Sequence, residues 1–220
     1  MEEVDHFNIG VHQTETGTIS IVITRLWPSL LRFTLKLMYE PMKGYLIDGI
    51  CLTILNNLAL VVEGFITDII TEMIKGEQLH VEFNPERATW SKKIAIYPKL
   101  SGKSLSEYPQ YEAIEILFIL RNNIAHGRSH SEIAKKNAPS DEWTYIESEN
   151  KNYQIVRDFL VQKGLMERKI NPSNFDAFWQ PLITAFFCSQ IEQFLFAVIN
   201  DLDDKKSFGI FSELRTACQR

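Results

Sequence analysis

The sequence predicts a mainly α-helical bundle of four to six helices, with a minor peripheral β-hairpin or short strands. Two stretches carry this prediction, from about Tyr45 to Lys75 and from about Asn174 to Leu202, because apolar residues recur in both at three- and four-residue spacing. The composition agrees, since 45% of the 220 residues are apolar and 23% are charged. A chain of this length suits one large helical domain with decoration at its edge.

The segment before the first long stretch predicts a short strand followed by a helix. Residues 18–24 are β-branched and partly alternating, which is typical of a strand. A helix is expected to start near Pro28 and to end at Pro41, since proline cannot continue a helix. We therefore expect residues 1–44 to form an N-terminal extension that packs on a helical domain of residues 45–220.

The helical domain is expected to contain two interruptions. Residues 79–105 break the helical period, since short alternating runs at 79–83 and 93–97 predict a small hairpin or an irregular excursion. Residues 129–151 are mostly polar and predict a surface loop or insertion.

Three helix boundaries carry local signals. Gly76 is a plausible C-cap for the first long helix, and Gly164 is expected to close a shorter helix that runs from Tyr153. Ser173 is a good N-cap for the last long helix, whereas Pro181 predicts a kink in that helix or its true start.

A further helix is expected to start near Ser106 or Pro109 and to run through Arg121.

Net charge limits how this chain meets a polynucleotide. The chain carries 28 acidic and 23 basic residues, a formal net charge of -5. Proteins that coat nucleic acid without sequence preference are normally basic. Any contact with a polynucleotide is therefore expected to be local, through a few Arg and Lys residues around one site.

The cysteines and the apolar stretches predict a cytoplasmic protein. Cys51, Cys188 and Cys218 are far apart and odd in number, which is typical of reduced thiols in the cytosol. The apolar stretch from Gly49 to Val62 contains two Asn residues and is too short and too polar for a membrane span. No apolar signal-peptide region follows the acidic N-terminus, so we expect no membrane association.

Arg121 and His126 are the candidate catalytic residues. Arg121 follows Leu117 by four residues and Phe118 by three, so it shares their apolar helix face. An Arg can bind the nonbridging oxygens of a phosphodiester and offset the charge of its transition state. A His titrates near neutral pH and can transfer a proton to or from a ribose oxygen. The two are five residues apart, about 140° around an ideal helix, so they converge only if the helix breaks or the site spans two chains.

The segment Arg121-Asn122-Asn123-Ile124-Ala125-His126-Gly127 resembles the Arg-x4–6-His signature of HEPN (higher eukaryotes and prokaryotes nucleotide-binding) domains. That family favours a polar residue, often Asn, directly after the Arg. The helical pattern around the segment agrees with the resemblance, which covers about Tyr45 to Leu202. Residues 1–44 and 79–105 are not explained by it.

The resemblance implies a metal-independent endoribonuclease without a cofactor. It implies that Arg121 binds the phosphate, that His126 is the acid or base, and that Asn122 and Asn123 support them. Members of the family usually form homodimers whose two motifs face each other in a composite active site. Many act as toxins of toxin–antitoxin systems, in abortive infection or in antiviral defence, so an antitoxin or a defence-system protein is an expected partner. Arg128 stands where one toxin subfamily has a modified Tyr, and here it is a candidate RNA contact.

Other interpretations of single residues stay open. His126 and His130 have a spacing that can bind zinc on a helix, but no third ligand is obvious, and we expect no metal. Glu63 interrupts the first long helix and is either a buried partner of Arg121 or a residue that faces solvent. The pairs Lys92–Lys93 and Lys135–Lys136 are expected to be solvated, although either pair can line a path for RNA.

Two alternatives to the ribonuclease remain. The first is a noncatalytic HEPN-like module that binds a nucleotide, RNA or a protein, which the acidic net charge favours. The second is a purely structural helical subunit, in which Arg121 and His126 only stabilise the fold. The second alternative predicts that Arg121→Ala substantially lowers the melting temperature.

Overall fold

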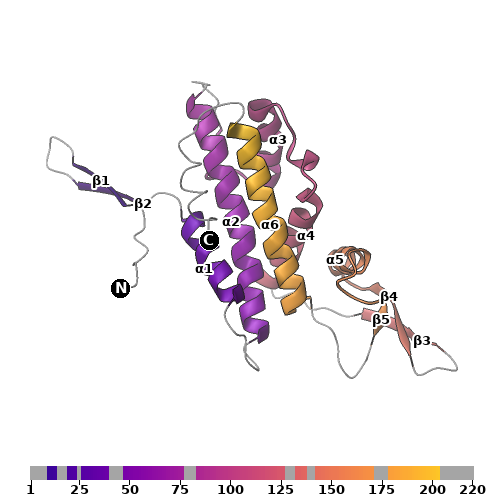
Figure 1. The fold of residues 1–220 in the computed structure, drawn as a ribbon. Helices are drawn as coiled ribbons and strands as arrows, with labels where there is room; N and C mark the ends of the chain where they lie inside the picture. Colours follow the sequence, from indigo (N-terminus) through magenta and orange to yellow (C-terminus); the bar gives the residue numbers. More distant parts are fainter. Residues whose placement is uncertain are drawn as a thin grey trace. The chain divides into compact units, whose positions relative to one another are not determined.

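A computed structural model describes residues 9–13, 19–23, 26–39, 47–76, 83–126, 132–137, 142–170 and 178–203 of the chain (Figure 1). These residues are mainly helical and carry short antiparallel strands, which confirms the predicted fold class. In chain order the elements are β1 (Ile9–Gln13), β2 (Ile19–Ile23), α1 (Trp27–Tyr39), α2 (Ile47–Gly76), α3 (Trp90–Ser101), the 3-10 helix η2 (Leu105–Glu107), α4 (Tyr111–Ala125), β3 (Glu132–Lys136), β4 (Trp143–Ser148), α5 (Lys151–Gln162), β5 (Lys169–Ile170) and α6 (Pro181–Asp203).

The chain divides into two compact units. The first contains Met1–Lys36, Leu60–Tyr108 and Leu195–Arg220, and the second contains Leu37–Ala59 and Pro109–Phe194. The long helices α2 and α6 therefore contribute residues to both units. The predicted boundary between residues 44 and 45 lies outside the described residues.

Most of the predicted helices are confirmed. Helices α1, α2, α4 and α5 lie where the apolar spacing predicts them, and β2 confirms the strand expected over residues 18–24. Helix α6 begins at Pro181, so this proline marks the start of the helix and does not kink it. The expected cap at Ser173 lies outside the described residues. Gly164 has a φ of 70°, the left-handed backbone that closes α5 as predicted.

In the first unit, the Trp27 side chain of α1 packs against α2. Its ring meets Phe65 edge-on with ring centroids 5.2 Å apart, and its Nε1 donates a hydrogen bond of 2.7 Å to Asp68 Oδ2. Gly64 lies against the same indole, because a Cβ built there would be 3.0 Å from the Trp27 Cβ. The absence of a side chain at Gly64 therefore lets α1 approach α2 closely.

The expected excursion at 79–105 is wrong for residues 90–101, which form helix α3. The alternating pattern from Lys93 to Tyr97 suggests a strand, but the buried residues of α3 are Lys93, Tyr97 and Ser101, at a spacing of four. Pro98 lies inside this helix, although it has no N–H to donate to the carbonyl four residues earlier. The helix ends at Gly102, whose φ of 74° lets its N–H bond to the Pro98 carbonyl at 2.9 Å.

In the second unit, aromatic rings join α5 to α6 and to the residues directly before α6. The Phe159 ring lies 6.0 Å from Phe186 and 6.5 Å from Phe187, and Tyr153 stacks on Phe178 at 5.4 Å. Rings at these separations bury large apolar areas and add a favourable electrostatic contact. Helix α5 also contacts α4, so it connects the helix that carries the motif to the start of α6.

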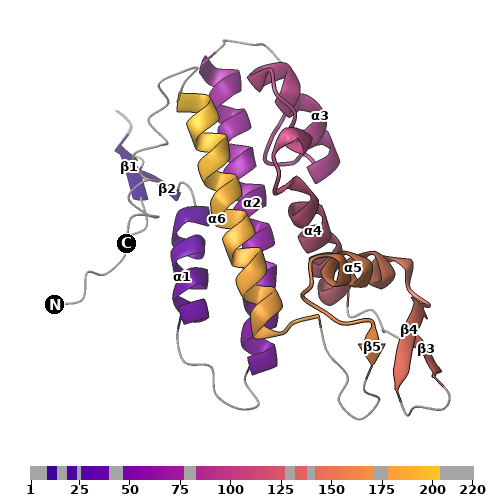
Figure 2. The same ribbon diagram turned by 45° about the vertical axis from the view of Figure 1, so that its right-hand side comes forward.

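The prediction of a loop over 129–151 is also wrong, because β3 and β4 form an antiparallel hairpin there. Strand β5 pairs with β4 and completes a sheet of order β3–β4–β5 (Figures 1 and 2). The strands are hard to recognise from the sequence because β3 is mostly charged and a register irregularity interrupts its alternation near Ile133. Lys135 and Lys169 both lie opposite Thr144, one on each side of β4.

Two cysteines lie in the core of the second unit. Cys51 of α2 and Cys188 of α6 are free and buried. Burial raises the pKa of the Cys188 thiol to about 12, and burial also raises the pKa of Cys51, against the effect of its contact with Thr184. Cys218 lies outside the described residues.

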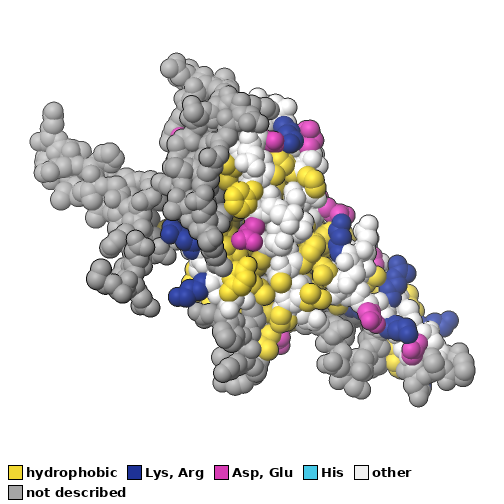
Figure 3. Space-filling view, viewed as in Figure 1, with side chains coloured by type: hydrophobic (Ala, Val, Ile, Leu, Met, Phe, Trp, Pro, Cys, Tyr) yellow, Lys and Arg dark blue, Asp and Glu magenta, His cyan; other side chains and the backbone are white. Residues whose placement is uncertain are grey.

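Helices α2 and α6 are long and apolar enough to cross a membrane by length and composition alone. Half of the apolar window of each is buried inside the protein, and core helices of soluble proteins meet the same criterion. Figure 3 shows hydrophobic side chains at the surface over these helices, and exposed residues there include Leu60, Leu182 and Phe196. The predicted absence of a membrane span stays a prediction.

A pair of glycines in α2 tests the packing of α1. Gly64→Ala is expected to destabilise the protein by about 1 kcal/mol or more, because the new methyl group presses on Trp27. Gly49→Ala is the matched control, since nothing lies within 4 Å of a Cβ built there, and it is expected to stabilise by about 0.5 kcal/mol through helix propensity. Thermal unfolding followed by circular dichroism measures both. Equal effects of the two substitutions would contradict the close contact at Gly64.

Candidate functional site

The candidate motif begins inside helix α4 and ends at its C-cap. Helix α4 runs to Ala125, and the His126 backbone N–H still bonds to the Asn122 carbonyl at 3.2 Å. His126 is the C-cap, with φ -93° and ψ 3° in the bridge region and not in the helical region. The helix is therefore regular from Arg121 to Ala125 and ends at His126.

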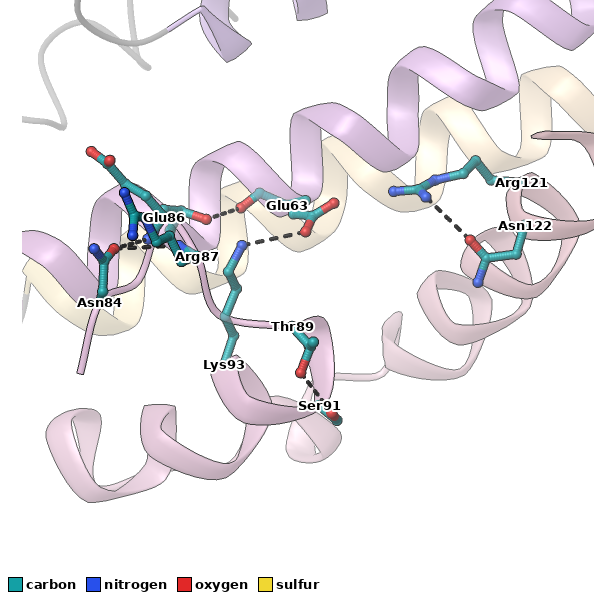
Figure 4. A network of polar contacts seen from close by, with 10 residues as sticks. Glu63, Asn84, Glu86, Arg87, Thr89, Ser91, Lys93, Arg121 and Asn122 are labelled. Atoms are coloured by element: carbon teal, nitrogen blue, oxygen red, sulfur yellow. Dashed lines mark hydrogen bonds and ion pairs between the residues drawn. The ribbon is translucent and has the colours of Figure 1, made fainter. Parts of the chain in front are cut away.

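Arg121 is held in part by its own neighbour. Its Nη1 donates a hydrogen bond of 3.1 Å to Asn122 Oδ1, as Figure 4 shows, and its guanidinium lies 5.8 Å from the centre of the Phe118 ring. The side chain of Arg121 is half-buried, whereas Asn122 is exposed. Asn122 thus has the geometry of a residue that orients the guanidinium.

His126 is exposed, but the helix does not bring it to Arg121. A rotation of about 100° per residue places side chains five residues apart at about 140° to each other. Because α4 is regular up to its C-cap, this angle applies to Arg121 and His126. The backbone of one chain therefore directs the two candidate groups to different sides of the helix.

Asn123 is the buried member of the motif. Its side chain has no exposed surface, and among the described residues neither its Nδ2 nor its Oδ1 has a hydrogen-bond partner. A buried amide without partners costs about 1–3 kcal/mol for each unsatisfied group. The sequence indicated a supporting residue at this position but did not reveal that its amide points into the protein.

Several predicted residues lie elsewhere. Arg128 and His130 lie outside the described residues, so the RNA contact and the zinc alternative stay predictions. Lys135 and Lys136 are exposed on β3, as expected for a solvated pair. Within the described ranges, no three His, Cys, Asp or Glu side chains gather closely enough to hold a metal ion.

The expectation of a solvated lysine is wrong for Lys93. Its side chain is 3% exposed, and its Nζ lies 3.4 Å from Glu63 Oε1 (Figure 4). The four-residue spacing of buried positions in α3 directs Lys93 inward, and Glu63 supplies an opposite charge. The pairing of Glu63 with Arg121 stays a prediction.

A polar cluster in the first unit was not indicated by the sequence. Tyr97 is fully buried and contacts Tyr108, which bonds to Asp201, and Asp201 is also paired with Lys103. Burial raises the pKa of Tyr97 to about 12 and raises that of Tyr108 further. Lys103 lies 4.1 Å above the Tyr108 ring. Both phenols keep their protons near neutral pH, so neither tyrosine supplies a base, and the cluster connects α3 and the residues after it to the end of α6.

Arg157 is the most buried arginine among the described residues. It is 2% exposed, its Nη2 donates to the Glu167 carbonyl at 3.2 Å, and its guanidinium lies 4.5 Å from the centre of the Tyr145 ring. It connects α5 to β4 and to the segment before β5. These contacts make Arg157 a structural residue, in contrast to the half-buried Arg121.

Comparison of the chain with protein families, with curated proteins and with solved structures found no match.

The two arginines give a test of the purely structural alternative. Arg157→Ala is expected to destabilise the protein by about 3 kcal/mol, because it empties a buried site and leaves the Glu167 carbonyl without its donor. Arg121→Ala is expected to cost less than about 1 kcal/mol, because the Arg121 side chain is only half-buried and its Nη1 donates to an exposed Asn. Urea unfolding of both variants measures the difference. A loss at Arg121 as large as that at Arg157 would favour a structural role for the motif.

Proposed function

We propose that this protein is a metal-independent endoribonuclease that acts as a homodimer. The observation that carries the proposal is the end of α4, where Arg121 bonds to Asn122 and the exposed His126 follows directly after the helix. These residues match the Arg-x4–6-His signature of HEPN domains, and the mainly helical fold agrees with that resemblance.

The proposed reaction needs no metal because RNA carries its own nucleophile. The 2′-oxygen attacks the neighbouring phosphorus, the bond from phosphorus to the 5′-oxygen breaks, and the products are a 2′,3′-cyclic phosphate and a 5′-hydroxyl. Arg121 binds the nonbridging oxygens and stabilises the negative charge that develops on them. His126 removes the proton from the 2′-hydroxyl or donates one to the leaving 5′-oxygen.

The angle between Arg121 and His126 supports a site made by two chains. In a two-fold symmetric dimer, each surface that carries a motif can face its equivalent on the partner. The guanidinium of one chain then reaches the phosphate from one side and the imidazole of the other chain reaches it from the opposite side. Such a cleft brings both groups to one phosphate although they lie on different sides of α4.

The resemblance to HEPN domains also favours a role in a toxin system or in antiviral defence. A cytoplasmic toxin or an effector of antiviral defence by abortive infection fits a nuclease of this kind, with an antitoxin or a defence-system protein as a partner. The noncatalytic alternative, a module that binds RNA, a nucleotide or a protein through Arg121, differs in a measurable way, because it predicts binding without turnover.

Cleavage of RNA in the presence of EDTA tests the reaction. The parent protein is expected to release fragments with 2′,3′-cyclic phosphate and 5′-hydroxyl ends, and His126→Ala and Arg121→Ala are each expected to lower the rate by about 100-fold or more. His12→Ala, the same chemical change in strand β1, is the control and is expected to cleave like the parent. Equal cleavage by the parent and His126→Ala would exclude the mechanism. Arg121-dependent binding without any cleavage would favour the noncatalytic alternative.

Mixing two inactive variants tests whether the site spans two chains. Arg121→Ala and His126→Ala chains are unfolded together, refolded and assayed for RNA cleavage. Half of the randomly formed dimers are mixed, and each mixed dimer keeps one of its two Arg–His pairs across the interface, so about a quarter of the parent activity is expected. Activity no higher than that of the separate variants would place both groups of each pair on one chain.

A further inference from the structure

The last turn of α4 is held by few buried side chains. Leu120 is fully buried, but Asn122, Ala125 and His126 are exposed, and Ile124 is half-buried. From Arg121 to His126 the only fully buried side chain is that of Asn123. The turn before the candidate catalytic His126 is therefore held mainly by Asn123, whose amide group is buried inside the protein.

That amide has no hydrogen-bond partner among the described residues, in contrast to the buried hydroxyl groups of Thr34, Thr184 and Ser101. The hydroxyl groups of Thr34 and Thr184 donate to carbonyl oxygens four residues earlier, at 2.7 Å and 2.8 Å. The Ser101 hydroxyl bonds to the Tyr97 carbonyl at 2.9 Å. Within the described part of the chain, the Nδ2 and Oδ1 of Asn123 have no such bond, although the side chain is fully buried. On folding, the Asn123 amide therefore loses its hydrogen bonds to water, and no hydrogen bond inside the protein replaces them.

We infer that Asn123 is a positioning residue that keeps the last turn of α4 ready to open. When the turn from Asn122 to Ala125 unwinds, the Asn123 amide regains hydrogen bonds to water, and this gain offsets part of the cost of the broken helical bonds. Little apolar area is lost, because most of the turn is already exposed. Opening is thus easier here than in the preceding turns, which end at the buried Leu117 and Leu120.

Opening changes what His126 can reach. In the closed helix the side chain of His126 leaves the backbone about 140° around the helix from that of Arg121. Once the last turn unwinds, the helical backbone no longer sets the direction of the His126 side chain. His126 can then move toward a phosphate held by Arg121 of either chain. This inference rests on the proposed ribonuclease function for its consequence, whereas the opening itself is a property of the helix and can be measured without RNA.

Asn123→Leu is the main test, because leucine has a similar volume and needs no hydrogen bonds. In this variant we expect the backbone amides of residues 123–126 to exchange with deuterium at least about fivefold more slowly than in the parent, since the closed turn loses its unsatisfied groups. We expect the melting temperature to rise. The kcat for RNA cleavage is expected to fall at least about fivefold while KM stays within about twofold, because Arg121 and His126 are unchanged.

Thr184→Val is the matched control, since it also replaces a buried polar side chain by an apolar one in the same unit, but at a satisfied hydroxyl outside the motif. It is expected to leave exchange at residues 123–126 and kcat unchanged. Asn123→Asp is the opposite change. A buried carboxylate favours the open turn, so exchange at these amides is expected to become faster than in the parent even if the melting temperature falls.

Three outcomes would overturn the inference. If Asn123→Leu lowers the melting temperature and leaves exchange unchanged, or Asn123→Asp does not speed exchange, the amide does not control the opening of the turn. If Asn123→Leu slows exchange but cleaves RNA like the parent, the opening is unrelated to catalysis. A parent protein that opens as expected and cleaves no RNA would instead remove the proposed function.

Discussion

The regular geometry of helix α4 is the constraint on which the interpretation of this protein depends. Because the helix continues to Ala125 and its hydrogen bonding extends to His126, the directions of Arg121 and His126 follow from the helical repeat. The packing of α4 on α5, and of α5 on α6 through Phe159, fixes the helix in the second unit. In one chain with a regular α4, the backbone therefore directs Arg121 and His126 to different sides of the helix.

The sequence predicted the fold well where an apolar face is long. Helices α2 and α4 have many apolar residues at helical spacing, so their presence does not depend on any one position. The prediction was wrong where the pattern is short or polar. The five residues from Lys93 to Tyr97 alternate by chance within a helix, and β3 carries charged residues that hide its pairing with β4. Short segments take their structure from tertiary contacts that the local sequence does not contain.

The candidate site was predicted in part. Spacing alone placed Arg121 on the apolar side of its helix and His126 at the helix end, and the structure agrees with both positions. The sequence alone does not show that Asn122 faces solvent and Asn123 faces inward. The answer depends on how α4 is rotated against its neighbours. Lys93 and Arg157 are buried with partners on other elements, Glu63 and the Glu167 carbonyl. The local sequence around each residue does not identify such a partner.

The raised pKa of Cys188 has a consequence for chemical durability. Peroxides and disulfides react with the thiolate form of cysteine. With a pKa of about 12, only roughly one Cys188 side chain in 10⁵ is ionised at neutral pH, and the residue is also shielded from solvent. Treatment with peroxide would therefore leave this part of the α6 packing chemically intact, and a thiol-reactive dye would label Cys188 only after the protein has unfolded.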